Sequence, residues 1–138
     1  MFRSFFSTRL GSLSGAPSIR RLKTYSAQTG YAYQYFYEGY RSYRKARAET
    51  GTEFVFRVWA GRKSGIVVRV LLADDAVHAW EQAHTRALTA TERYAIAKMA
   101  LFQAFDERAT PAFLKQDVCV RLADVDAILE TLGIEPEE

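Results

Sequence analysis

Hydrophobic and polar residues alternate in the first half of the chain, which predicts β-strands there. Residues 52–60 and 66–72 each alternate with a period of two and are joined by the turn sequence GRKSG, so they form a hairpin. In a symmetric loop, Phe56 lies opposite Val70, and Arg57 lies opposite Arg69. Facing arginines repel each other unless an acid or an aromatic ring lies between them.

A third alternating stretch, residues 30–37, has tyrosine at every second position and predicts another strand. The sequence EGYRSYRKARAETG that follows allows two interpretations. The strand either continues to about Tyr43, or residues 38–51 form a short basic helix that ends at Gly51.

The second half of the chain has a helical period, and its main element is residues 89–108. Thr89 and Glu92 have the spacing of a capping box, and the interior contains no glycine or proline. Apolar residues extend around more than one side, so we expect the rest of the chain to pack on this helix.

Shorter patterns complete the predicted fold. They indicate a helix over 75–87, a strand within 114–122, and a last helix that begins at Asp124 and ends at Gly133. The predicted order is β-β-β-α-α-β-α. We therefore expect a single two-layer α+β domain whose mainly antiparallel sheet packs on helix 89–108.

Residues 1–29 differ in composition from the rest. The first 37 residues contain five basic residues and no acid, whereas the remainder carries fourteen basic and sixteen acidic residues. This basic, serine-rich start is typical of a mitochondrial transit peptide, with cleavage near 23–27, or of a disordered tail. We therefore expect the domain to span 30–135, located in the mitochondrial matrix if the source is eukaryotic and in the cytoplasm otherwise.

Few residues suggest catalysis, a metal or a cofactor. His78, Glu81 and His84 share one helix, but the two histidines lie about 240° apart around it, so we expect no metal site and expect His84 to pack beside Trp80. Cys119 is the single cysteine, so no internal disulfide forms, and we expect it to be buried. No phosphate-binding loop or nucleophile motif is present, no cofactor is expected, and no apolar run is long enough to span a membrane.

Lys98 offers an enzymatic alternative. It projects from the aromatic face of helix 89–108, where loss of water would lower the pKa of its ammonium and make the amine nucleophilic. The more common arrangement lays the lysine stem on the aromatic surface with its head group in water.

The sheet face opposite this helix is the predicted functional site. Arg57, Trp59 and Arg69 point to that face, and we expect tyrosines of the first strand to join them. The predicted binding residues are Tyr33, Tyr35, Arg57, Trp59, Arg62, Lys63 and Arg69. Tryptophan, tyrosine and arginine are frequent at protein interfaces and also stack on nucleic-acid bases. We therefore expect a small, non-catalytic binding module whose partner is a protein or a larger assembly. The alternative partner is RNA or single-stranded nucleic acid. If a segment of the chain itself covers this face, the site does not exist.

Overall fold

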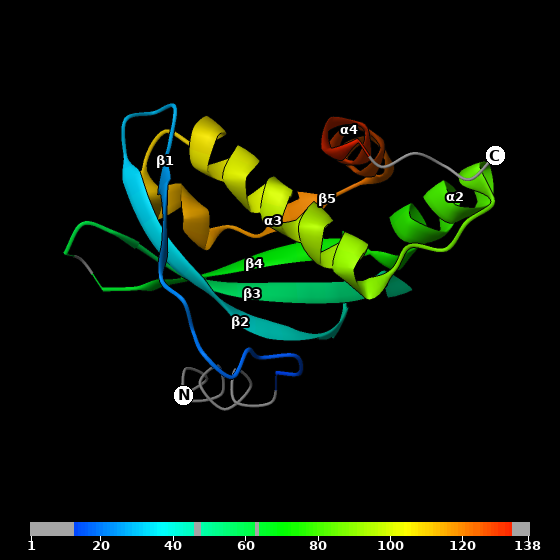
Figure 1. The fold of residues 1–138 in the computed structure, drawn as a ribbon, viewed down its shortest axis with the longest axis horizontal. Coiled ribbons are helices and arrows are strands. Elements are labelled where there is room, and N and C mark those ends of the chain that lie inside the picture. Colours follow the sequence, from blue (N-terminus) through cyan, green and yellow to red (C-terminus); the bar gives the residue numbers. More distant parts are fainter. Residues whose placement is uncertain (1–12, 46–47, 63, 134–138) are drawn as a thin grey trace.

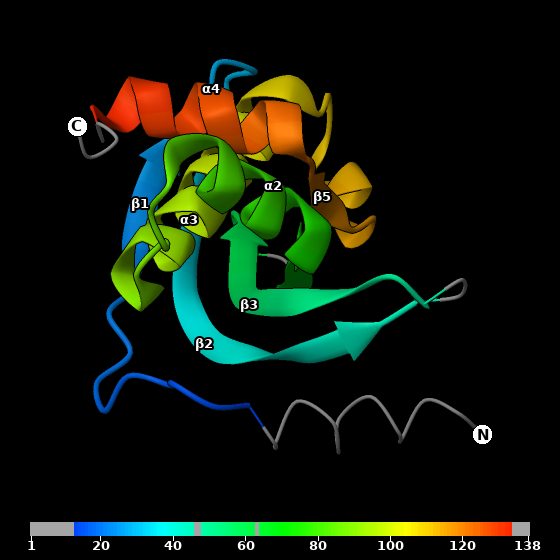
Figure 2. The same ribbon diagram turned by 90° about the vertical axis from the view of Figure 1, so that its right-hand side faces the viewer.

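Five strands form one curled sheet, and three helices cover one of its faces (Figure 1). The computed structural model describes residues 13–45, 48–62 and 64–133. Figure 2 shows that the long strands bend around the helices, so the helix-covered face is concave. This arrangement is the two-layer α+β domain that the sequence predicts. We call the opposite face of the sheet the outer face.

The strands lie side by side in chain order. They are β1 (Lys23–Ser26), β2 (Ala32–Arg44), β3 (Thr50–Ala60), β4 (Ile66–Ala73) and β5 (Val118–Val120). The first four are antiparallel, whereas β5 runs parallel to β4, so a helical crossover joins these two strands. The sheet is therefore mainly antiparallel, as predicted, with one more strand than expected.

The hairpin of β3 and β4 is confirmed, but the predicted register is wrong by two residues. Arg57 pairs with Val67, and Arg69 pairs with Val55. The two strands stop pairing at Val58 and Ile66, so the connection spans residues 59–65 and the symmetric five-residue loop does not form. A shift of two residues leaves every side chain on its predicted face, because the side-chain period of a strand is two.

Strand β2 continues to Arg44, which confirms the extended interpretation of this stretch and rules out the short helix. Its pairing with β3 slips by one residue between Tyr37 and Gly39. Gly39 has φ of 131°, and a Cβ atom there would lie 2.5 Å from the backbone oxygen of Ser14. The bulge reverses the alternation, so Tyr40 faces the helices and Arg41 faces outward.

The sheet extends upstream of residue 30, where the domain was expected to begin, because it includes β1. Tyr25 of this strand stacks on Phe102 at 4.4 Å, and its hydroxyl donates a hydrogen bond to Asp106 at 2.7 Å. Further upstream, the backbones of Ser14 and Tyr40 exchange two hydrogen bonds of 2.8 Å. This strand was not predicted from the sequence, because it has only four residues and lies in a segment of basic composition.

The helices within the described residues are α2 (Asp74–His84), α3 (Ala90–Glu107) and α4 (Leu122–Leu132), with a short 3-10 helix η2 (Pro111–Lys115) before β5. Thr89 and Glu92 form the predicted capping box of α3. Gly133 adopts the left-handed conformation that ends α4, also as predicted. Helix α3 crosses the concave face diagonally (Figure 1), and six of its residues are buried. It is the centre of the core, as the sequence indicates.

Two further predictions concern single side chains. His84 stacks on Trp80 with ring centroids 4.2 Å apart, which confirms the expected packing. Cys119 is exposed on β5, so its predicted burial is wrong. The alternation of β5 buries its flanking valines and turns the cysteine outward.

Candidate functional site

The residues predicted to form one binding face lie on two different faces. Arg57, Trp59 and Arg69 belong to the outer face, as expected from the alternation of β3 and β4. Tyr33 and Tyr35 belong to the concave face, where only 0% and 5% of their surface is exposed. Their placement on the outer face is therefore corrected: they are core residues packed against Phe105 of α3. Arg62 is exposed after β3, and Lys63 lies outside the described residues.

A glutamate missed by the sequence analysis organises one end of the outer face. Glu38, on the β2 bulge, is 9% exposed and accepts from Arg57 at 3.1 Å. Its other carboxylate oxygen lies 3.2 Å from Arg20, in the segment before β1. Two guanidinium groups therefore share one nearly buried carboxylate.

A second trio of the same kind forms further along the sheet. Glu53, which is 7% exposed, accepts from Arg41 at 3.0 Å and from Arg69 at 3.1 Å. The predicted pairing of Arg57 with Arg69 required an acid between the two arginines. Acids are present beside both, but Arg57 binds Glu38 and Arg69 binds Glu53. The sequence signal was an acid at an outward position of a mostly apolar strand. A charge in such a place needs a partner, because burying an unpaired charge is costly.

Trp59 is half-buried on the outer face and is held by two neighbours. Its ring lies 5.4 Å from that of Phe36. On its other side it rests on the backbone of Gly65, where an added Cβ would lie 2.9 Å from the indole. The guanidinium of Arg20 lies over the Phe36 ring, 5.5 Å from its centroid, and makes a cation–π contact with it.

A shallow hollow of about 390 Å³ opens beside this aromatic pair. We call it the Trp59 hollow, and its lining consists of Arg20, Leu22, Gln34, Phe36, Trp59, Gly61 and Arg62. Leu22 is 53% exposed at its rim, and Ile19, three residues earlier, is 66% exposed. The hollow therefore combines apolar anchors with arginines at the edge.

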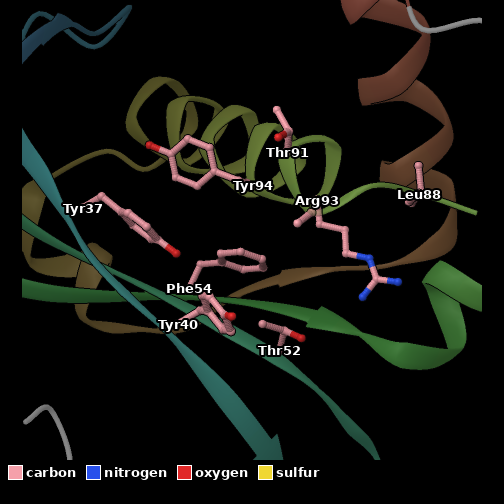
Figure 3. Close-up of a pocket in the computed structure, with 9 residues that line it drawn as sticks. Tyr37, Tyr40, Thr52, Phe54, Leu88, Thr91, Arg93 and Tyr94 are labelled. Atoms are coloured by element: carbon pink, nitrogen blue, oxygen red, sulfur yellow. The ribbon is translucent and has the colours of Figure 1, made fainter. Parts of the chain in front are cut away.

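The concave face contains a larger opening that the sequence did not indicate. A cleft of about 580 Å³ lies between the sheet and the first turns of α3 (Figure 3). We call it the tyrosine cleft, and its lining consists of Tyr37, Tyr40, Thr52, Phe54, Leu88, Ala90, Thr91, Arg93 and Tyr94. Its volume is within the range of small-molecule sites.

Two tyrosines of this cleft, Tyr37 and Tyr94, have raised pKa values and are neutral at physiological pH. Burial raises the pKa of Tyr37 well above its usual value, and the nearby Tyr94 and Tyr40 add to this effect. Burial also raises the pKa of Tyr94. Both phenols therefore remain hydrogen-bond donors, and the Tyr37 hydroxyl points into the cleft (Figure 3).

Lys98 lies close to the arrangement expected for it. Its ammonium is 5.8 Å from the Phe102 ring centroid, and the side chain is half-buried. Burial lowers the pKa of this lysine, and the neighbouring Lys23 ammonium lowers it further. Lys98 thus contacts an aromatic ring, as is common for lysine, and its lowered pKa also favours the neutral amine.

The described residues contain neither a metal-binding cluster nor a membrane-spanning helix. Within residues 13–45, 48–62 and 64–133, no group of three or more His, Cys, Asp or Glu side chains is arranged to hold a metal ion. No helix in the described part of the chain is long and apolar enough to cross a membrane.

Comparison with known proteins adds no relative: no family model matches the sequence, and no similar curated protein or solved structure was found. The chemistry of the two faces is therefore the basis for assigning a function.

Proposed function

We propose that this protein is a non-catalytic interaction module that binds a protein partner at the Trp59 hollow. The supporting observation is that Trp59 and Phe36 form a half-buried aromatic pair, bordered by the exposed Leu22 and by Arg20 and Arg62. Large aromatic side chains lose little conformational entropy on binding, and tryptophan and arginine are enriched among the energetic hot spots of protein interfaces.

The charge pairing on the outer face favours a protein over RNA. In an RNA complex, Arg57 and Arg69 would have to contact phosphates, but both are bound to nearly buried glutamates. A phosphate that took either arginine would remove one of the two arginines that neutralise a nearly buried carboxylate, which is costly. The tyrosines that would stack on bases lie on the other face of the sheet.

The test is capture of binding partners from an extract of the source cells. Wild-type protein is compared with Trp59→Ala and with Arg62→Glu, since Arg62 is exposed and its replacement leaves the core intact. Phe113→Ala is the matched control, because Phe113 is a 48% exposed aromatic residue on η2. We expect one protein that binds to wild type and to the control, resists nuclease and high salt, and is lost with both hollow variants.

Two results would contradict this proposal. Binding that disappears with nuclease and weakens steeply with salt would indicate RNA, because counterion release dominates such complexes. Equal capture by all variants would place the partner site elsewhere. The bound protein is then identified by mass spectrometry and its affinity is measured with purified components.

Mitochondrial import is a separate proposal that concerns the N-terminal segment. If the precursor is processed, the structure favours cleavage upstream of residue 14, because cleavage near 23–27 would remove β1 and the Arg20–Glu38 ion pair. Mass measurement of the mature N-terminus in the source cells decides between the two positions. A mature chain that begins after residue 22 would contradict this choice.

A second candidate function is an enzyme that uses Lys98 as a nucleophile, and the lowered pKa of its ammonium supports it. Incubation with a panel of aldehydes and ketones, followed by borohydride reduction, would attach one adduct at Lys98. Lys115→Met is a matched lysine control that should still form the adduct, and Lys98→Met should not. An unmodified Lys98 across the panel would reject the enzyme.

A further inference from the structure

The tyrosine cleft is independent of the Trp59 hollow, since it opens on the concave face and shares no lining residue with it. Tyr37 and Tyr94 meet edge to face with ring centroids 4.8 Å apart. Phe54 is almost fully buried at the floor, with the Tyr40 ring 6.2 Å away. Figure 3 shows these rings grouped on one side of the cleft, which forms an apolar and aromatic surface.

The other side of the cleft is cationic. Arg93 is the one charged residue among those that line it, and its side chain extends from α3 toward the sheet (Figure 3). Its Nε–H is buried without a hydrogen-bond partner among the described residues. One terminal nitrogen lies 3.6 Å from Glu81, a long ion pair that leaves donors available on the guanidinium.

The two acids nearest to Arg93 in this region, Glu81 and Glu92, do not line the cleft. Glu92 is held by Arg86 at 3.0 and 3.1 Å and does not line the cleft. The Glu81 oxygen nearest to Arg93 accepts a shorter hydrogen bond, of 2.7 Å, from the Leu88 backbone, so its contact with Arg93 stays long. The N-terminal end of α3, at Ala90 and Thr91, adds the positive end of a helix dipole.

We propose that the tyrosine cleft binds a small, flat molecule that carries both an aromatic ring and a carboxylate. The ring packs against Tyr37, Tyr94 and Phe54, and the carboxylate binds the Arg93 guanidinium. Thr52 and Thr91 border the same cleft and offer hydroxyl groups to the carboxylate or to a ring substituent. The volume of about 580 Å³ accommodates one or two fused rings with a short acidic chain.

Three probes separate the contributions of ring and charge. These are 2-naphthoate, which has both, 2-naphthamide, which has the ring alone, and octanoate, which has the acid alone. Calorimetry or NMR titration of the full chain measures each affinity. We expect 2-naphthoate to bind at least about tenfold more tightly than either other probe, because a hydrogen-bonded charge adds roughly that factor.

Variants of the chain locate the binding. Arg93→Gln should reduce 2-naphthoate affinity about tenfold and leave 2-naphthamide affinity unchanged. Ala90→Trp, which fills the cleft from an exposed position, should abolish binding of both probes. Arg62→Gln is the control and should bind like wild type. Unchanged thermal unfolding of each variant shows that the fold is retained.

The proposal is overturned if none of the probes binds, if the three probes bind equally, or if Arg93→Gln binds 2-naphthoate as wild type does. Binding that survives Ala90→Trp would also overturn it, since the ligand would lie elsewhere. None of these outcomes depends on the protein partner at the Trp59 hollow.

Discussion

The aromatic row on the concave face of β2 has two ends with different roles. At the closed end, Tyr33 and Tyr35 are buried, and the Tyr33 ring stacks on Phe105 at 4.4 Å. At the open end, Tyr37 and Tyr40 line a cleft with Tyr94. The same residue type on the same strand face thus forms the core at one end and a surface at the other.

The difference comes from what covers each end. Strand β1 and the C-terminal half of α3 close the first end, where Tyr25 stacks on Phe102. At the other end β2 carries the Gly39 bulge, and the first turns of α3 lie beside the cleft without closing it. A residue's role therefore depends on the element above it, which the strand pattern alone does not specify.

Removing a large side chain at each end should produce the largest contrast. We expect Phe105→Ala to lower the free energy of unfolding by about 3–5 kcal/mol, because it leaves a cavity in a closed core. Tyr94→Ala, at the half-buried open end, should cost less than half as much. Urea unfolding measures both, and equal losses would show that the open end is also packed core.

The hydroxyl of Tyr33 gives a second test, with a gain in stability. It is buried without a hydrogen-bond partner among the described residues. Tyr33→Phe should therefore raise the free energy of unfolding by about 1–2 kcal/mol, because it removes an unsatisfied polar group. Thermal and urea unfolding check this, and a loss of stability would reveal a partner such as a buried water molecule.

The same substitution at Tyr25 should have the opposite sign. Its hydroxyl donates a 2.7 Å hydrogen bond to Asp106, so Tyr25→Phe should cost about 1 kcal/mol. Asp106→Asn serves as the partner variant, and the double variant should lose less than the sum of the two. Strict additivity would mean that the two groups do not interact.

The cap of α3 at the open end should show a pH dependence. Hydrogen bonds from Arg86 and from the Thr89 backbone lower the pKa of Glu92 in the folded state. Its contribution is thus present above the unfolded pKa of about 4.5 and is lost as pH falls through the lower folded pKa. Glu92→Gln should cost about 0.5–1 kcal/mol at pH 7, and the difference should disappear in acid. A constant difference between pH 7 and pH 3 would exclude this linkage.

The smallest effect is expected for the Tyr94 hydroxyl. Tyr94 is half-buried and lines the open cleft, so Tyr94→Phe should change stability by less than about 0.5 kcal/mol. Urea unfolding beside Tyr33→Phe and Tyr25→Phe compares one substitution in three environments. A loss as large as that of Tyr25→Phe would show that the Tyr94 hydroxyl is bonded within the core.

Much of the outer face was predictable because alternation alone places side chains on a face. Arg57, Trp59 and Arg69 share that face despite the wrong register, since the error was two residues. The prediction that Tyr33 and Tyr35 belong to the binding face was wrong, because these side chains and Trp59 point to opposite faces of the sheet. In the pairing of β2 with β3, Trp59 lies opposite Gln34 and not opposite a tyrosine. The tyrosine cleft joins β2, β3 and α3, so no local pattern could reveal it.

The sequence by itself determined the helix 89–108 with its Thr89 cap, the alternation of the strands and the α+β class, because these depend on contacts between near neighbours. Only the tertiary structure decided that β1 joins the sheet, that Glu38 and Glu53 neutralise the arginines, and which tyrosines are covered. These features depend on residues far apart in the chain, and their positions follow from the Gly39 bulge and the diagonal path of α3.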